Sequence, residues 1–163
     1  MLHINVGGAT FAPVTAIPAK LATNAGLAAL QLDNAAQTRI ISITGGPPDG
    51  PFLFDELPFD FDRIDQDVSL NTTEAWTIGA GAASSHSFHI HGVQFRIVAR
   101  NGNPADVKPW EQGWKDTFYI PIAEKVTFVV RFGETADAAH PFMYHCHMIN
   151  HEDEGLMGQF TVR

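Results

Sequence analysis

The sequence predicts an all-β fold, an antiparallel β-sandwich or barrel. The chain has 163 residues, which is about the length of one ordinary domain. From residue 52 onward it consists of short runs rich in β-branched and aromatic residues, without long helical patterns between them. The 14 glycines and 10 prolines fit a chain that turns often. Short strands at this spacing are typical of two packed sheets or of one closed sheet.

The strand-like runs are separated by turn signals. We expect strands at residues 2–6, 39–44, 64–70, 74–78, 87–100, 117–120, 125–132, 141–147 and 158–162. The turn at 45–51, Gly-Gly-Pro-Pro-Asp-Gly-Pro, is not a phosphate-binding loop because no Lys-Ser/Thr pair follows it. Residues 1–37 are rich in alanine and weakly patterned, and Gly26 interrupts the helix-like run within them, so we interpret them as linker and edge structure.

The composition argues against several classes of protein. Lysine and arginine total 10 against 18 Asp and Glu, a net charge of -8, so we expect no nucleic-acid partner. No apolar run approaches the roughly 18 residues that a spanning helix needs, so we expect no membrane span. The N-terminus lacks the features of a signal peptide, which predicts either a cytosolic protein or a chain that does not begin at the native start. A single cysteine excludes an intrachain disulfide.

Histidines are concentrated in two clusters, the first of which is His-Ser-Phe-His-Ile-His at 86–91. Because successive side chains of a strand alternate between its faces, His89 and His91 point to one side, and the apolar residues between them point toward a core. Two imidazoles then converge on one metal region. His86 lies at the start of the strand, where a bend would aim it at a different site.

The second cluster surrounds the only cysteine with histidines. The same alternation places His145 and His147 on one face of a strand and Cys146 on the other, so one short peptide contacts two sites. His151 follows closely enough for a loop to bring it and Cys146 to one ion. Together with His86 they form a His₂Cys donor set, which is the ligand type of blue-copper electron-transfer sites.

Structural histidines and zinc are the competing interpretations of these clusters. A single histidine is more often a satisfied core or surface residue, but two alternating clusters around one thiol argue against that reading. A closed structural zinc site normally takes four ligands and usually more than one cysteine. Copper fits better, because a thiolate flanked by two ligating histidines offers a short covalent route for an electron between two metal sites.

These motifs resemble the C-terminal cupredoxin domain of the multicopper oxidases, which include laccases, bilirubin oxidases and bacterial copper-efflux oxidases. The resemblance rests on His-x-x-His-x-His-Gly at 86–92, followed by His-Cys-His-x-x-x-His-Glu-Asp at 145–153. The segments 61–65 and 113–117 support it. It implies a cupredoxin-like Greek-key β-sandwich or barrel over residues 52–163, with residues 1–51 as the end of a preceding domain and a linker.

The resemblance implies a type 1 copper, which receives electrons from the reducing substrate. Its ligands would be His86, Cys146 and His151, and Cys146 would pass the electrons on. In bacterial relatives the axial position, ten residues after the cysteine, is usually methionine, but here it is Leu156. Leucine does not coordinate, so we expect a three-coordinate type 1 copper of high potential, unless a bulge brings in Met157.

The resemblance also implies a trinuclear copper cluster, where dioxygen becomes water. His89 matches a type 2 copper ligand, whereas His91, His145 and His147 match ligands of the binuclear type 3 copper. Glu152 matches an acidic group that delivers protons to the cluster. The family's cluster needs eight histidines, and this chain matches four of them. We therefore expect an N-terminal cupredoxin domain as the partner that supplies the other four.

The implied function is oxidation of a small reducing substrate, a phenol, an arylamine or a metal ion, coupled to reduction of O₂. The alternative is a single-cupredoxin electron carrier with type 1 copper only, although such a carrier has no need of the second histidine set. A copper nitrite reductase fits less well, because there only one side of the cysteine has a coordinating histidine. The family resemblance implies a periplasmic or extracellular location.

The substrate is expected beside an exposed edge of His151 or, as a second choice, of His86. Trp110 and Trp114 lie in a long loop that would border such a cleft. Packing is the commoner role of tryptophan, so we favour that role for both.

Overall fold

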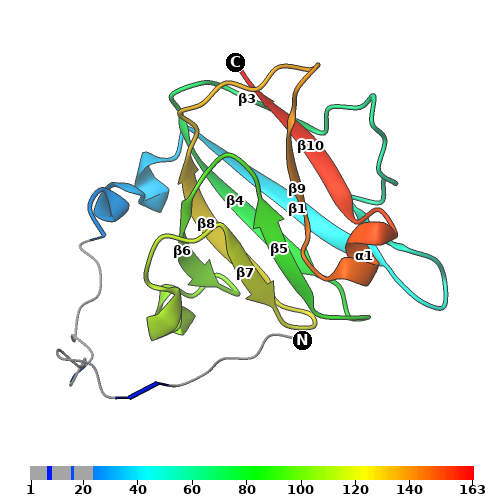
Figure 1. Cartoon of the computed structure of the whole chain (residues 1–163), viewed down its shortest axis with the longest axis horizontal. Helices are drawn as coiled ribbons and strands as arrows, with labels where there is room; N and C mark the ends of the chain where they lie inside the picture. The colour runs from blue at the N-terminus through cyan, green and yellow to red at the C-terminus, as the bar shows by residue number, and fades with distance from the viewer. Residues whose placement is uncertain (1–6, 9–15, 17–23) are drawn as a thin grey trace.

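Two five-stranded sheets pack face to face in the computed structural model, which describes residues 7–8, 16 and 24–163 (Figure 1). The first sheet has the order β2-β1-β4-β8-β6, and the second has the order β3-β10-β9-β5-β7. The strands are β1 Gln37–Gly45, β2 Phe52–Phe54, β3 Gln66–Val68, β4 Thr73–Ala80, β5 His86–Ile90, β6 Phe95–Arg100, β7 Thr117–Ile120, β8 Lys125–Arg131, β9 Phe142–Cys146 and β10 Met157–Val162. The all-β, cupredoxin-like sandwich predicted from the sequence is confirmed.

Helical structure is short throughout the described residues. The α-helix α1 spans Ile149–Asp153, and the 3₁₀ turns are η1 Leu27–Ala29, η2 Leu32–Asn34, η3 Pro104–Asp106 and η4 Pro109–Glu111. None of these helices is long and apolar enough to cross a membrane. The strand expected at 2–6 lies outside the described residues.

The core lies between the sheets and is built from one face of each strand. Trp76 on β4 is fully buried, and its ring centroid lies 6.0 Å from those of Tyr144 on β9 and Phe160 on β10. Edge-to-face contacts of this kind add to the stabilisation that aromatic burial provides. The core therefore joins the two sheets at the strands next to the metal-ligating segments.

The sandwich includes a strand, β1, from the range 1–51. β1 pairs in parallel with β4 from Gln37↔Glu74 to Ile43↔Ala80, and Ile41 and Ile43 are buried in the core. The boundary expected at residue 51 thus falls between the paired strands β1 and β2, and residues 37–51 belong to the sandwich. Each sheet, expected to be antiparallel, contains one parallel pair, β1–β4 in the first sheet and β3–β10 in the second. In both cases the chain crosses to the other sheet before it returns to complete the pair.

The single strand expected at 87–100 is two strands that lie in different sheets. The chain turns after β5 at Gly92, whose φ is 73°. A Cβ at this position would lie 2.7 Å from Cζ of Phe142, so only glycine fits without a shift of that ring. This turn carries the chain from the second sheet to the first and leaves His91 at its beginning.

Candidate metal centre

The two groups of potential ligands lie on opposite faces of the second sheet. His86 is buried on the core side of β5, and His89 is on the outer side. An odd number of positions separates them, so strand alternation alone sends them to different faces. The bend expected at His86 is therefore not needed to separate the two sites.

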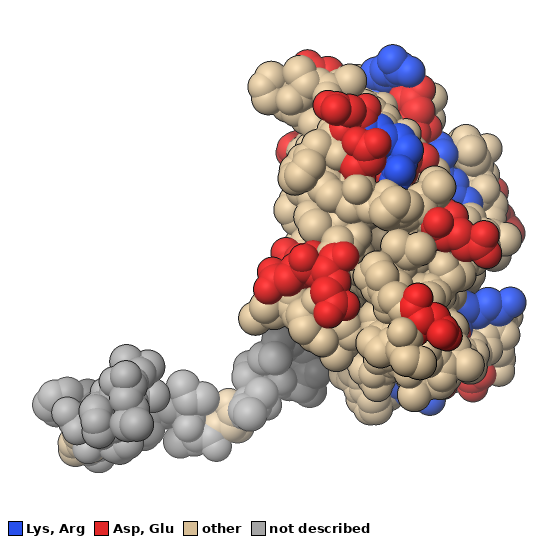
Figure 2. All heavy atoms as spheres, turned by 90° about the vertical axis from the view of Figure 1, so that its right-hand side faces the viewer, with Lys and Arg blue, Asp and Glu red and all other residues tan. Residues whose placement is uncertain are grey.

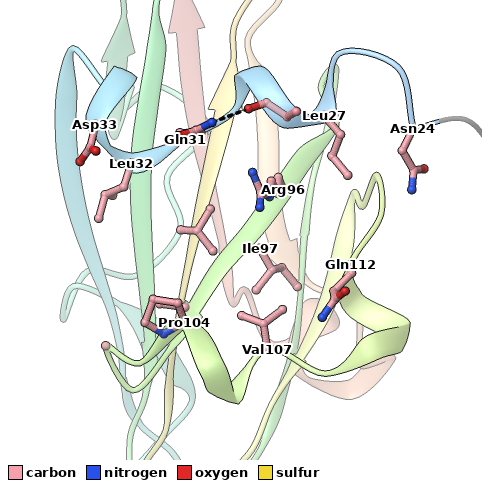
Figure 3. Close-up of a pocket in the computed structure, with 14 residues that line it drawn as sticks. Asn24, Leu27, Gln31, Leu32, Asp33, Arg96, Ile97, Pro104, Val107 and Gln112 are labelled. Carbon is pink, nitrogen blue, oxygen red and sulfur yellow. Dashed lines mark hydrogen bonds between the residues drawn. The ribbon is translucent and has the colours of Figure 1, made fainter.

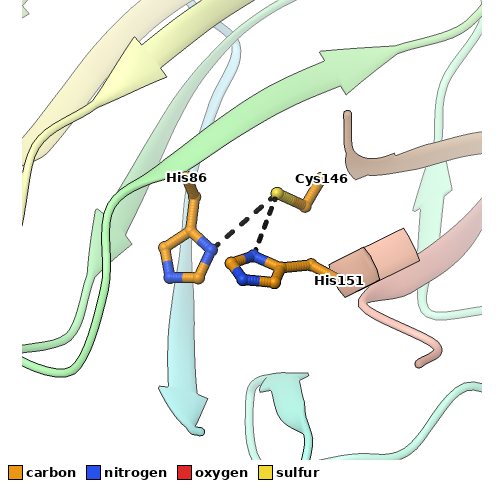
Figure 4. A group of neighbouring side chains, drawn as sticks. All are labelled: His86, Cys146 and His151. Carbon is orange, nitrogen blue, oxygen red and sulfur yellow. Dashed lines mark hydrogen bonds between the residues drawn. The ribbon is translucent and has the colours of Figure 1, made fainter. Parts of the chain in front are cut away.

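The inner set consists of His86, Cys146 and His151 (Figure 4). The Sγ atom of Cys146 lies 3.8 Å from Nδ1 of His86 and 3.6 Å from Nδ1 of His151. All three are buried: the exposed fraction is 1% for His86, 0% for Cys146 and 6% for His151. His151 comes from α1, whose first turn returns the chain to β9 through the hydrogen bond from the His151 N–H to the carbonyl oxygen of Met148. The exposed edge expected at His151 is thus small.

Phe52 covers both imidazoles of the inner set. Its ring centroid lies 4.7 Å from that of His86 and 4.5 Å from that of His151. Phe52 begins β2, directly after the turn at 45–51, and is buried. Sequence reasoning did not find this residue, because nothing in the local pattern shows that β2 lies against β5 and α1.

The β9–β10 pairing places Leu156 and Met157 on different faces. Met157 is opposite His145, on the outer side, and the carbonyl oxygen of Leu156 accepts a hydrogen bond from the N–H of Cys146. Leu156 is fully buried on the side of Cys146. The geometry therefore shows no bulge that would bring Met157 to the inner set. That Leu156 is a non-coordinating axial residue stays a prediction.

The outer set is formed by His89, His91 and His145, whose ligand atoms all lie within 4.8 Å of one another. Nε2 of His91 is 3.1 Å from Nε2 of His145. His147 is adjacent, with its ring centroid 5.4 Å from those of His89 and His145. His91 and His147 are exposed, whereas His145 is buried. This set opens to the surface of the described domain.

Neighbouring groups orient two imidazoles of the outer set. Nδ1 of His89 lies 3.0 Å from the carbonyl oxygen of Asp116 and 2.8 Å from Oγ1 of Thr117. A carbonyl oxygen only accepts, so Nδ1 carries the proton and Nε2 keeps its lone pair for a metal. Nδ1 of His145 lies 3.3 Å from Oε2 of Glu152, with the same consequence. The contacts of Asp116 and Thr117 require the β5–β7 pairing, which sequence reasoning did not find.

Burial keeps the inner set neutral when no metal is bound. Loss of solvation lowers the pKa of His86 to about 4, and the nearby His151 imidazole adds to this effect. Loss of solvation also lowers the pKa of His151 and raises the pKa of the Cys146 thiol. The imidazoles are therefore ready to bind a metal near neutral pH, whereas the thiol must lose its proton on binding.

Acid is expected to destabilise the metal-free domain through His86. Its folded-state pKa lies below its ordinary value of 6.5, so the unfolded chain binds the proton first as the pH falls. Above pH 6.5, His86 should not change the free energy of unfolding with pH. As the pH drops from 6.5 toward 4, the contribution of His86 should lower this free energy by up to about 3 kcal/mol. Urea unfolding across this range measures the slope. His86→Gln should flatten it, and the exposed His140→Gln should not; equal slopes in both variants would contradict the assignment.

The donor chemistry of the inner set fits copper. It provides one thiolate and two imidazoles, the combination found in blue-copper sites, and no carboxylate is part of the set. The second set provides only imidazoles, which also suit copper. The fold and the two donor sets together define a cupredoxin-like copper-binding domain.

A family model described as "Multicopper oxidase" matches residues 29–163. The chain belongs to the multicopper oxidase family. It is 36% identical to the multicopper oxidase mco of Staphylococcus haemolyticus over 110 residues, which cover 64% of this chain and 23% of that protein. The crystal structure of a multi-copper oxidase from Pediococcus acidilactici has a TM-score of 0.72 and 34% identity, covering 82% of this chain and 28% of the other.

Another relative, the cell division protein FtsP of Escherichia coli, is not named as an oxidase. It is 36% identical over 114 residues, which cover 70% of this chain and 23% of that protein. The chain spans about a quarter of the length of the curated relatives it matches. Because the relatives include both oxidases and a cell division protein, an activity must be argued from the residues of this chain.

The tryptophans expected beside a substrate cleft have different surroundings. Trp114 packs against a small cluster of buried residues that includes Leu30 and Val129, so packing is its role. Trp110 is 73% exposed and lines a separate cavity of about 300 Å³ together with Tyr119. Neither His86 nor His151 is among the described residues that line this cavity.

Proposed function

We propose that this chain is the C-terminal copper-binding part of a multicopper oxidase. A reducing substrate would be oxidised at a type 1 copper, and electrons would pass to a trinuclear cluster that reduces O₂ to water. The observation that supports this most directly is the position of Cys146 on β9, in the inner set, between His145 in the outer set and His147 beside it. An electron carrier with one copper would not need the outer histidines.

The chain's own residues provide an electron route between the sets. Copper supplies one-electron redox chemistry when it is bound. From Sγ of Cys146, a few covalent bonds of side chain and backbone lead to the imidazoles of His145 and His147. The inner set is closed from water by its burial and by Phe52, whereas the outer set is open. The direction proposed from the family is from the buried inner set toward the open outer one.

Glu152 is proposed as the residue that delivers protons to the outer set. Its Oε2 lies 3.3 Å from Nδ1 of His145, and its side chain is 35% exposed. It can therefore contact the outer set and exchange protons with solvent. His145 in turn is held with Nε2 toward His91.

The proposed partner is an N-terminal cupredoxin domain that supplies the other four cluster histidines. The outer set together with His147 provides four histidines, and the exposure of His147 on this open side supports that proposal. The substrate is proposed to be a phenol, an arylamine or a metal ion. On the side of the molecule where α1 lies, acidic side chains cover more of the surface than basic ones do (Figure 2). This negative charge favours a positively charged electron donor, such as a metal ion, among the proposed substrates. A periplasmic or extracellular location is proposed from the family.

Copper content and oxygen uptake test the proposed function. The copper-loaded chain should show the blue absorption of a copper thiolate and should not reduce O₂ alone. The chain together with the proposed N-terminal domain, here called the whole protein, should bind more copper per chain and consume O₂ when given a phenol, an arylamine or a reduced metal ion. Blue absorption without oxygen uptake by the whole protein would favour the electron carrier. Failure of the whole protein to bind copper would overturn both.

Replacing Leu156 by Met is expected to lower the reduction potential of the blue copper. A thioether beside Cys146 would stabilise the oxidised ion, and Leu156 is the buried side chain on that face. The matched variant Met157→Leu should leave the potential and the blue absorption unchanged. A clear rise in potential for Met157→Leu would show instead that Met157 coordinates. Redox titration followed by the blue absorption measures both variants.

A further inference from the structure

A cavity at the edge of the first sheet has no part in the proposed oxidase chemistry. It has a volume of about 700 Å³ and lies between β6, the strap formed by residues 24–34, and the loop formed by residues 101–116 (Figure 3). This volume is in the range of roughly 300–1,000 Å³ that small-molecule sites occupy. Both sets of potential ligands lie on the second sheet, beside it at His91, or on α1.

The lining of the cavity offers an apolar surface. Leu27 and Leu32 face it from the strap, Val98 from β6, and Pro104 and Val107 from the loop. Leu32 is 52% exposed, so part of this apolar lining meets solvent. A ligand with an apolar body would remove this surface from water.

The edge of β6 presents unpaired backbone groups to this cavity. β6 is the last strand of its sheet, and β8 is its partner strand among the described residues. On its free side, Phe95 exchanges hydrogen bonds with Lys115, and Arg100 exchanges them with Asn103. Strand alternation directs the N–H and C=O of Ile97, two residues after Phe95 and just before the irregularity between Ile97 and Ala99, to the same free side. No isolated bridge or loop hydrogen bond of the described residues involves Ile97 there. Ile97 also lines the cavity, so these groups are available to a ligand.

Arg96 adds a positive charge beside Ile97. Its Nη1 donates a hydrogen bond to the carbonyl oxygen of Leu30 at 3.2 Å, which ties the strap to β6. Among the described residues, no carboxylate lies within ion-pair distance of this guanidinium. Asp33 also lines the cavity, but Figure 3 shows it at the far end, pointing away from Arg96. Arg131 also has no acidic partner among the described residues, but Arg96 is the arginine that lines the cavity.

We propose that this cavity binds a small amphipathic organic anion. The apolar body lies against the strap and the loop, and the anionic group accepts hydrogen bonds from the Arg96 guanidinium and from the Ile97 N–H. A guanidinium and a backbone N–H are donors that recognise a carboxylate or sulfonate, and the charge assistance makes such bonds stronger than neutral ones. The proposal is independent of copper binding and of the oxidase function.

Fluorescence titration of the copper-free chain tests the site with two probes of similar shape. 1-Anilinonaphthalene-8-sulfonate carries the anionic group, and N-phenyl-1-naphthylamine lacks it. We expect saturable binding of one sulfonate per chain, roughly tenfold or more tighter than binding of the neutral dye, because a hydrogen bond to a charged group is lost in the latter. Equal affinity for the two dyes would overturn the proposal.

Two variants with matched controls locate the binding. Arg96→Met should remove the preference for the anion, and Arg131→Met, at an exposed site on β8, should keep it. Ala28→Trp should fill the cavity from the exposed strap and abolish binding, whereas Ala29→Trp, one residue on and not in the lining, should not. Binding that survives Ala28→Trp would show that the dye sits elsewhere. Circular dichroism of each variant checks that the sandwich is retained.

Discussion

Replacing Cys146 by Ser is expected to abolish the blue absorption of the copper-loaded chain. The serine hydroxyl is a harder ligand than the thiolate and does not suit this type of copper site. Oxygen uptake by the whole protein should fall more than about 100-fold, because loss of a direct ligand costs more than the 10–100-fold typical of changes around one. Absorption spectroscopy and oxygen consumption measure the two effects.

The control for this variant lies in the same strand connection. Met148→Leu changes a partly buried side chain near Cys146 without removing a ligand, so it should keep the blue absorption. Copper bound to the outer set should persist in Cys146→Ser, since none of its ligands changes, and electron paramagnetic resonance would detect it. A blue absorption that survives Cys146→Ser would contradict the assignment of the inner set.

Replacing Gly158 by Ala is expected to lower the free energy of unfolding by about 1–3 kcal/mol or more. Gly158 is directly opposite Tyr144 in the β9–β10 pair. A Cβ there would lie 2.3 Å from Cζ and 2.4 Å from Oη of Tyr144. The ring cannot move away easily, because it is 1% exposed and packs against Phe54 and Trp76.

Gly133→Ala is the matched control for this stability effect. A Cβ at Gly133 would meet no heavy atom within 4 Å beyond its own residue and its chain neighbours, so the free energy of unfolding should change little. In a chain that already carries Tyr144→Leu, Gly158→Ala should lower the free energy of unfolding by less than it does in the unchanged chain, because the smaller side chain makes room for the Cβ. Chemical denaturation of the four variants and of the unchanged chain measures these effects. Equal stability of the two alanine variants would show that Tyr144 does not fill the space above Gly158.

The parts of the site that follow from strand periodicity were predictable from the sequence. His145, Cys146 and His147 alternate because side chains of a strand alternate, and the structure places them accordingly. The same rule assigns His86 and His89 to different faces. Only His151 depends on a turn, and the short distance along the chain from Cys146 made its position a reasonable expectation.

The parts that depend on contacts between distant segments were not predictable. Phe52 reaches the inner set because β1 and β2 belong to the sandwich, whereas the sequence placed the domain boundary between them. Thr117 reaches His89 because β7 pairs with β5. The prediction of a single strand at 87–100 was wrong for a related reason. The turn at Gly92 is packed against the ring of Phe142, which lies on another strand. Local patterns contain no information about these neighbours.

The different exposure of the two donor sets has a consequence for the kinetics of metal uptake. The outer histidines meet solvent, so an ion reaches them by diffusion, at a rate proportional to its concentration. The inner set is closed over by Phe52, and its most exposed ligand, His151, is only 6% exposed. An ion can enter there only when β2 or α1 opens locally. Filling of the inner set should therefore approach a limiting rate at high copper concentration, equal to the rate of that opening.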